Sequence, residues 1–325
     1  MAKSSKLEAL TAELNQIRPN PTSENGLNVL SRVIASRYGI AVAQAARLVS
    51  EFEIHSLMPE LAAAFDRFLV KAKDRDPGCR AKQAIADALY RLDYYDAELF
   101  LKGIRYVQWE PVWGGQVDTA PKLRGTCALG LVRMNYPAVM VELADLLADP
   151  EPEARIGAAR AVAYSENPLG VALLRLRIKV GDSPTVLGEC AAALLKLAAT
   201  DTLPLIEAFL EAGRKESDSR ESIETAEVMA LVLGESRLPE ALLLLQAWWQ
   251  RTTHPELRQT GLLAIASLRR DEALEFLLQL LREGSAKDAR AALAALELYR
   301  SDDFLWPRVA AILEQRSDLH SRTLD

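Results

Sequence analysis

Small and apolar residues recur along this chain at spacings that place them on one face of a helix. Counted from an anchor residue, a small residue lies three positions on, alanine or leucine four, and an apolar residue seven. The clearest copies are residues 124–131 (RGTCALGL), 155–162 (RIGAARAV), 187–194 (LGECAAAL), 258–265 (RQTGLLAI) and 289–296 (ARAALAAL). These three positions share one helical face. The small residues predict that a second helix approaches this face closely.

Weaker copies begin at Val42, Arg80 and Ser222. The eight anchors, at 42, 80, 124, 155, 187, 222, 258 and 289, are separated by 38, 44, 31, 32, 35, 36 and 31 residues. A second apolar helix lies between most anchors, several of them with proline at the first turn. Examples are residues 137–147, 204–212, 239–249 and 272–281. Each unit is therefore expected to be helix, turn, helix, and strand signals are nearly absent.

The repeat changes what the chain length implies. A chain of 325 residues is too long for one compact core, but in a repeat array each unit packs only on its neighbours. We therefore predict an all-α, right-handed solenoid of about eight helix pairs over residues 24–315. Residues 1–23 are expected to form a short helix and a proline-rich link. Residues 103–119 form a loop insertion, and residues 316–325 form a tail.

An acidic residue precedes several anchors by six positions. The pairs with arginine are Asp74 with Arg80, Asp118 with Arg124, and Asp149 with Arg155. Arg258 departs from this rule, because the residue six positions before it is Thr252 and not an acid. We interpret the pattern as a structural ladder in which a turn aspartate meets a helix arginine, within or between repeats. An exposed pair of this kind contributes about 0.2–1 kcal/mol.

The stretches 149–162 (DPEPEARIGAARAV) and 254–266 (HPELRQTGLLAIA) resemble the turn and arginine-bearing second helix of the HEAT-repeat superfamily. The resemblance covers roughly residues 24–315 and implies a curved superhelix that acts as a scaffold or adaptor. Some members of the superfamily are enzymes or enzyme subunits: deoxyhypusine hydroxylases, bilin lyases and alkylpurine DNA glycosylases. The hydroxylases bind iron through His-Glu pairs. None of the three histidines here, His55, His254 and His320, is followed by glutamate.

Net charge and cysteine content narrow the possible functions and the cellular compartment. The formal net charge is −6, which argues against nucleic-acid binding because that depends on clustered Lys and Arg. No stretch is long and apolar enough for a membrane span, and no apolar segment of a secretory signal follows Met1–Lys6. The cysteines, Cys79, Cys127 and Cys190, are odd in number and far apart. They indicate a reducing compartment, so we expect a cytoplasmic protein, with a monomer favoured.

One interval departs from the repeat. The 44 residues between Arg80 and Arg124 exceed a normal unit by roughly a dozen, and the extra segment is rich in aromatic residues and glycine. The residues that we single out for binding are Tyr106, Trp109, Glu110, Trp113, Gly114 and Gly115. Tryptophan and tyrosine are typical anchors of protein interfaces. The alternative is that the tryptophans plug a gap between helices, and both can hold.

The sequence supports a catalytic site less than it supports a binding segment. Glu110 and Asp118 could converge across the Gly-Gly turn, but Asp118 already has a ladder position. Cys127 and Cys190 lie at the small-residue position, where packing explains them. Cys79 lies at a helix start, where a thiolate is favoured. Because no phosphate loop, CxxC, HExxH or GxSxG motif occurs, we predict no catalytic residue, cofactor or metal, and an enzyme is the less favoured class.

Three functions remain open. The leading one is a scaffold that binds another protein, as yet unidentified, through the solenoid surface and the aromatic loop. The second is a lyase-type enzyme or chaperone subunit, which would need a pocket that gathers the tryptophans with an acid. The third is DNA-lesion binding, in which Trp109, Trp113 and Asp118 would supply an aromatic pair and an aspartate. Helical-repeat glycosylases use such a set beside a basic face, and the acidic balance argues against it.

Overall fold

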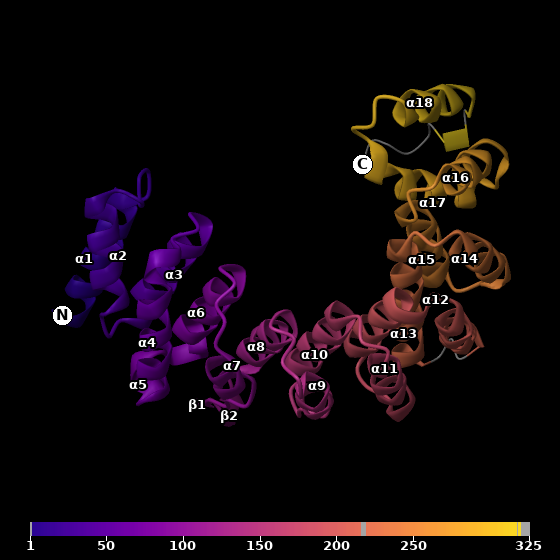
Figure 1. The fold of residues 1–325 in the computed structure, drawn as a ribbon. Helices are drawn as coiled ribbons and strands as arrows, with labels where there is room; N and C mark the ends of the chain where they lie inside the picture. Colours follow the sequence, from indigo (N-terminus) through magenta and orange to yellow (C-terminus); the bar gives the residue numbers. More distant parts are fainter. Residues whose placement is uncertain (1, 216–218, 317, 320–325) are drawn as a thin grey trace. The chain divides into compact units, whose positions relative to one another are not determined.

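The chain is almost entirely helical in the computed structural model, which describes residues 2–215, 219–316 and 318–319. The predicted all-α class is confirmed, with helices paired along the chain (Figure 1). The chain divides into two compact units, Met1–Leu173 and Leu174–Asp325, called here the N-terminal and C-terminal units. The boundary falls within α11 (Leu169–Val180). Most of the expected tail, residues 317 and 320–325, lies outside the described residues.

In the N-terminal unit, helices that carry the repeat pattern pack on one another in succession, α3 on α6, α6 on α8 and α8 on α10. The bounds are α1 (Ala2–Ile17), α2 (Glu24–Ile34), α3 (Gly39–Glu51), η1 (His55–Leu57), α4 (Met58–Leu69), α5 (Ala72–Arg75), η2 (Pro77–Cys79), α6 (Arg80–Arg91), α7 (Ala97–Ile104), β1 (Trp109–Val112), β2 (Gly115–Asp118), α8 (Pro121–Arg133), α9 (Val139–Leu147) and α10 (Pro152–Ser165). The first helices of the repeats pack against this row, α7 on α8 and α9 on α10.

The C-terminal unit repeats the arrangement, with α12 on α13, α13 on α15 and α15 on α17. The bounds are α12 (Pro184–Lys215), α13 (Arg220–Ser236), α14 (Pro239–Arg251), α15 (Pro255–Ser267), α16 (Asp271–Glu283), α17 (Ala286–Leu296), η3 (Glu297–Tyr299) and α18 (Leu305–Gln315). The helix expected to start at Pro204 is instead part of α12, which continues through Pro204 and has one non-helical residue, Ala198. The turn between these two helices is therefore reduced to a kink.

Local chemistry explains where the helices begin. The side chains of Ser23, Ser219 and Ser285 accept hydrogen bonds from main-chain amides of the first turns of α2, α13 and α17. These bonds satisfy amides that no helical carbonyl can reach. Other helices, α8, α10, α14 and α15 among them, have proline in the first turn, where its missing N–H has no helical partner to lose.

The small residues of the repeat face allow neighbouring helices to approach closely, as the pattern predicted. A Cβ atom added to Gly157 of α10 would lie 2.5 Å from the Cα atom of Gly125 in α8. Between α7 and α8, a Cβ atom on Gly103 would lie 2.3 Å from Cys127 Sγ. The residues three positions after the clearest anchors are all buried: Cys127, Ala158, Cys190, Gly261 and Ala292. A larger residue at these places would force the repeats apart.

Candidate functional site

The insertion before α8 folds as a β-hairpin, where the sequence predicted a loop. Strands β1 and β2 are antiparallel, with Trp109 opposite Asp118 and Val112 opposite Gly115. Trp113 and Gly114 form the two-residue connection, and Gly114 has φ +88°. A type II turn requires such a φ at its third position, and glycine adopts it without strain. The Gly-Gly pair signalled this turn, but the short strands beside it lack a β-branched run.

The base of the hairpin is held by a buried carboxylate, Asp118. Its Oδ1 atom accepts hydrogen bonds from the amides of Gln108 and Ala120, both at 2.9 Å. Its Oδ2 atom accepts from Arg124 Nη1 at 2.6 Å, and both side chains are 2% exposed. Burial alone would raise the pKa of Asp118, but these bonds and the charge of Arg124 hold the pKa below its ordinary value. Asp118 is therefore an ionised structural anchor.

Arg124 connects this base to the next repeat. Its Nη1 atom also donates to the carbonyl oxygen of Tyr106 at 3.0 Å, and its Nη2 atom donates to Asp149 Oδ1 at 2.9 Å. Asp149 lies in the turn between α9 and α10. Arg155, which was expected to meet Asp149, donates from Nη1 to the main-chain oxygen of Asp149 at 2.6 Å. The ladder thus forms both within a repeat and between repeats.

The expected pair of Asp74 with Arg80 does not form among the described residues, which corrects the ladder at its first position. Gly78 and Cys79 have φ values of +73° and +55°, so the chain turns sharply between Asp74 and Arg80. Asp76 and Lys82 pair instead, with Lys82 Nζ 2.8 Å from Asp76 Oδ2 and both side chains at most 1% exposed. This pair has the same six-residue spacing, so the sequence signal was present two positions further on.

Glu110 links the hairpin to the turn before α6. Its Oε1 atom accepts from Gly78 N at 2.7 Å, from Gln108 Nε2 at 2.6 Å and from Thr119 Oγ1 at 3.0 Å. Burial acts to raise the pKa of Glu110, but these hydrogen bonds lower it below its ordinary value. Glu110, through Oε1, and Asp118, through both carboxylate oxygens, are therefore each held by three donors, and both act as anchors. Sequence reasoning missed Gln108 and Thr119, whose side chains carry no motif.

Tyr106 belongs to the same base. Lys82 Nζ lies 5.2 Å from the centre of its ring, and its hydroxyl donates to Gln108 Oε1 at 3.1 Å. Burial raises the pKa of Tyr106 to about 12, so this hydroxyl keeps its proton at neutral pH and remains a donor. Of the six residues singled out for binding, Tyr106 and Glu110 thus stabilise the base of the hairpin.

The two tryptophans of the hairpin differ in exposure. Trp113, at the tip, is fully exposed at 103%, and Trp109 is 44% exposed. Val107, Val112 and Val117 add exposed apolar area along the hairpin. Trp113 therefore fills no gap between helices, whereas Trp109 is partly covered and lies beside residues 71–74. The structure separates the predicted binding segment into an anchored base and an exposed apolar tip.

A groove runs beside the base of the hairpin, with a volume of about 470 Å³. It is lined by Lys71, Ala72, Lys73, Asp74, Tyr106, Val107, Gln108 and Trp109. Both lysines are exposed. The groove therefore joins an aromatic and aliphatic wall to two cationic side chains on its rim.

The remaining candidates from the sequence lie apart from this surface. Cys79, Cys127 and Cys190 are buried and form no disulfide, and burial raises the pKa of Cys79 to about 12. The thiolate expected at the start of α6 is thus disfavoured. Within the described ranges, no cluster of three or more His, Cys, Asp or Glu could hold a metal ion. Within the same ranges, no helix has the length and apolar character to cross a membrane.

Comparison with family models agrees with this architecture. A family model of HEAT repeats matches residues 206–297, which confirms the resemblance drawn from the repeat pattern. A similar solved structure is the complex of CpcE and CpcF of phycocyanin lyase from Nostoc sp. PCC7120. It shares 17% sequence identity, with 79% of this chain and 94% of that chain covered and a TM-score of 0.41. No curated protein matches the sequence.

Proposed function

We propose that this chain, whose residues 206–297 match a family model of HEAT repeats, is a scaffold that binds a protein partner through the tip of the β1–β2 hairpin. The observation that carries the proposal is the full exposure of Trp113 on a hairpin whose base is anchored by buried ion pairs. An isolated exposed aliphatic residue is ordinary. A fully exposed tryptophan on an anchored turn is not.

Energetics favour this tip as an anchor. Burial of a large apolar side chain contributes about 1.5–3 kcal/mol, a gain that Trp113 does not realise within this chain. The turn is short and the base is fixed by Asp118 and Glu110. Little conformational entropy is therefore lost when a partner covers the tip, and such preorganisation strengthens binding. Tryptophan is also enriched among residues that dominate interface energies.

The groove beside the hairpin supports a more specific partner chemistry. Trp109 and Val107 offer apolar contacts, while Lys71 and Lys73 stand exposed on its rim. A partner segment with an apolar residue and nearby carboxylates would complement both features. Such rim charges act mainly on the association rate and on selectivity.

The experiment places a photo-crosslinking phenylalanine analogue at position 113 in the full-length chain, with the same analogue at Tyr95 as a control. Tyr95 is 72% exposed and lies in the same unit. We expect one protein to be captured from position 113 and not from position 95. With that protein purified, Trp113→Ala should weaken binding about 30-fold or more, and Tyr95→Ala should leave it unchanged. Equal affinity for Trp113→Ala and the unmodified chain would refute the proposal.

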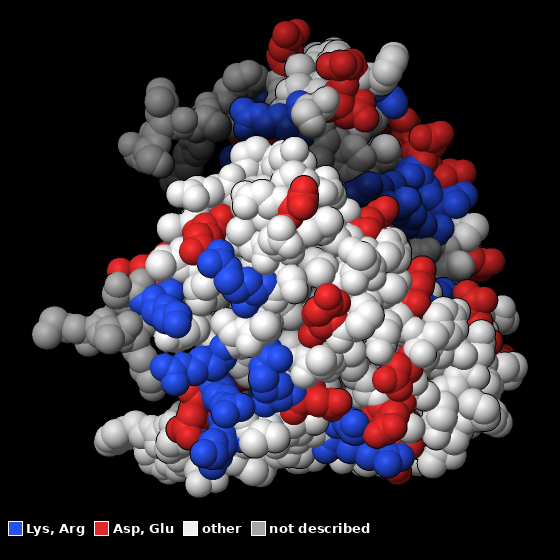
Figure 2. Space-filling model, turned by 60° about the vertical axis from the view of Figure 1, so that its left-hand side comes forward, with Lys and Arg blue, Asp and Glu red and all other residues white. Residues whose placement is uncertain are grey.

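The other two functions receive less support. Lesion binding needs a free aspartate beside the tryptophans, whereas Asp118 is buried against Arg124. Figure 2 shows Lys and Arg side chains interspersed with Asp and Glu on the face that it draws, so that face offers phosphates no uniform basic surface. For a lyase, the groove that holds Trp109 and Asp74 does not include Trp113 among its lining residues. Three buried cysteines that form no disulfide support a reducing compartment, the cytoplasm.

A further inference from the structure

Several second helices of the repeats end at a residue with left-handed backbone, and none of these residues is glycine. They are Glu53, Asp93, Asn135, Glu166, Arg237 and Arg269, with φ between 51° and 57°. Glycine is the usual residue at such a helix end, because a side chain strains this conformation. In the N-terminal unit the position holds an acid or an amide, whereas in the C-terminal unit it holds arginine twice. The fold alone gives no reason for arginine there.

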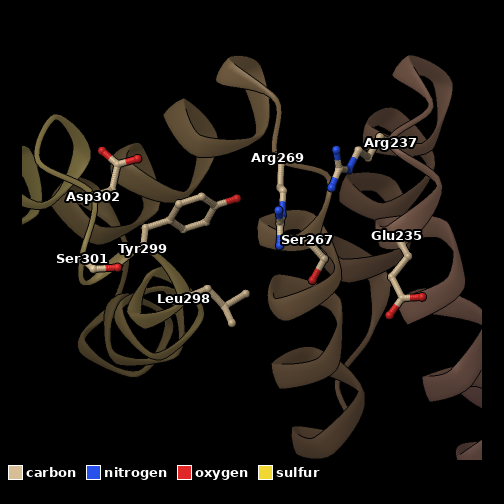
Figure 3. Close-up of a pocket in the computed structure, with 8 residues that line it drawn as sticks. All are labelled: Glu235, Arg237, Ser267, Arg269, Leu298, Tyr299, Ser301 and Asp302. Carbon is tan, nitrogen blue, oxygen red and sulfur yellow. The ribbon is translucent and has the colours of Figure 1, made fainter. Parts of the chain in front are cut away.

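Both arginines line one pocket of about 530 Å³ in the C-terminal unit (Figure 3). The other lining residues are Glu235, Ser267, Leu298, Tyr299, Ser301 and Asp302. In Figure 3 the side chain of Arg237 is turned toward that of Arg269. The left-handed ends of α13 and α15 thus direct two cationic groups of successive repeats to the same space.

Among the described residues, Arg237 and Arg269 make no side-chain hydrogen bond or ion pair, although other arginines of this unit do, such as Arg258 with Asp288 at 2.5 Å and Arg308 with Glu275 at 2.6 Å. Both side chains are exposed, so solvent screens part of their repulsion, and an anion that lies between the two like charges relieves the rest. The two arginines therefore place positive charge at this part of the pocket.

Among the described residues, the two acids of the lining form no ion pair with either arginine. Asp302 Oδ1 accepts from the amides of Phe304 and Leu305 at 2.9 and 2.8 Å, at the start of α18. These bonds lower the pKa of Asp302 and keep its charge at the helix N-terminus. The carboxylate of Glu235 points away from the arginines in Figure 3. Both acids are thus directed elsewhere.

The other residues that line the pocket suit the organic part of a ligand. The hydroxyls of Ser267 and Tyr299 donate to the carbonyl oxygens of Leu263 and Ala266, at 2.9 and 2.6 Å, so their protons are not offered to a ligand. The Tyr299 ring and Leu298 form an apolar side. Ser301 has no hydrogen bond within the described residues and remains a free donor.

We propose that this pocket binds the dianion of a phosphomonoester carried by a small organic molecule. Guanidinium groups bind phosphate oxygens through paired, charge-assisted hydrogen bonds, and two of them match a dianion better than a singly charged carboxylate. Tyr299 and Leu298 then contact the organic part, and the volume fits a small ligand. The site is independent of the hairpin, which lies in the other unit.

The test is a calorimetric titration of the full chain at pH 8 and 0.15 M NaCl with phenyl phosphate, inorganic phosphate and benzoate. Phenyl phosphate, a dianion at this pH, should bind saturably, more tightly than inorganic phosphate and more tightly than benzoate. The variant Arg237→Gln/Arg269→Gln should bind phenyl phosphate at least about tenfold more weakly. The control Arg282→Gln/Arg308→Gln removes the same charge elsewhere in the unit and should bind as the unmodified chain does.

Three results would overturn the proposal. The first is no saturable binding of phenyl phosphate by the unmodified chain. The second is equal weakening in both double variants, which would indicate a general effect of net charge. The third is equal affinity for benzoate and phenyl phosphate, which would exclude a requirement for the dianion. Circular dichroism of each variant confirms that the helices are retained, so loss of binding cannot come from unfolding.

Discussion

Arg124 Nη2 donates to Asp149 Oδ1 at 2.9 Å, although Arg124 lies in α8 and Asp149 in the turn before α10. The same guanidinium holds Asp118 at the base of the hairpin. One buried side chain therefore joins the hairpin, its own repeat and the next repeat. The base of the hairpin is thus tied directly to the repeat stack.

We expect Arg124→Met to lower the free energy of unfolding by about 3–5 kcal/mol, because it leaves Asp118 buried without its cation. Urea denaturation followed by circular dichroism measures this loss. The control is Arg91→Met, which removes an exposed pair with Asp87 and should cost less than about 1 kcal/mol. Similar losses for the two variants would contradict the central role of Arg124.

Glu110 should make stability depend on acid pH. Its folded pKa lies below the ordinary value, so its contribution is fully present above the unfolded pKa of about 4.3. The contribution is lost as pH falls through the lower, folded pKa. The difference in unfolding free energy between the unmodified chain and Glu110→Gln should therefore be largest at neutral pH and shrink below about pH 4. A difference that stays constant from pH 7 to pH 3 would show that the carboxylate is not stabilised.

The hairpin turn should tolerate alanine at one glycine and not at the other. Gly114 has φ +88°, whereas Gly115 has no such value, and an added Cβ atom would meet nothing within 4 Å at either place. Gly114→Ala should therefore destabilise the turn by about 1–2 kcal/mol, and Gly115→Ala should not. Amide hydrogen exchange of residues 109–118 measures the effect directly. Equal exchange in both variants would refute the turn geometry.

The three cysteines should be inert in the folded protein. Burial raises the pKa of Cys79 to about 12 and that of Cys127 still further, and all three side chains are buried. A thiol-disulfide reagent at pH 8 should label none of them within minutes, since the thiolate is the reactive form. The same reagent in 6 M guanidinium chloride should label three per chain. Rapid labelling of one cysteine without denaturant would show that its thiol is accessible and would contradict this prediction.

Arg237→Gly should stabilise the chain by about 0.5–1 kcal/mol. The left-handed conformation at φ 56° costs arginine about 1–2 kcal/mol, while the greater freedom of unfolded glycine offsets part of the gain. Thermal unfolding measures the change, with Arg308→Gly as a control that should destabilise because Arg308 lies within α18. If the glycine variant is more stable, then arginine is kept at this place for a reason other than folding.

Much of the candidate site was accessible from spacing alone. The excess length before Arg124 located the insertion, and the six-residue spacing predicted the contact of Asp118 with Arg124 at 2.6 Å. The same spacing misassigned Asp74 to Arg80, because the left-handed residues Gly78 and Cys79 intervene. Asp76 and Lys82 took that role. The six-residue spacing predicts a contact only where the backbone between the acid and the basic residue has the conformation that it has between Asp118 and Arg124.

The sequence by itself determined the helices, the small faces on which they stack and the segment that departs from the repeat. These follow from local periodicity, because side chains three and four residues apart share a helix face whatever the rest of the chain does. Only the tertiary structure decided that Arg124 reaches Asp149, that Trp113 stands clear of the helices, and that Arg237 and Arg269 meet in one pocket. Such contacts depend on how one repeat is set against the next, which a local pattern does not encode.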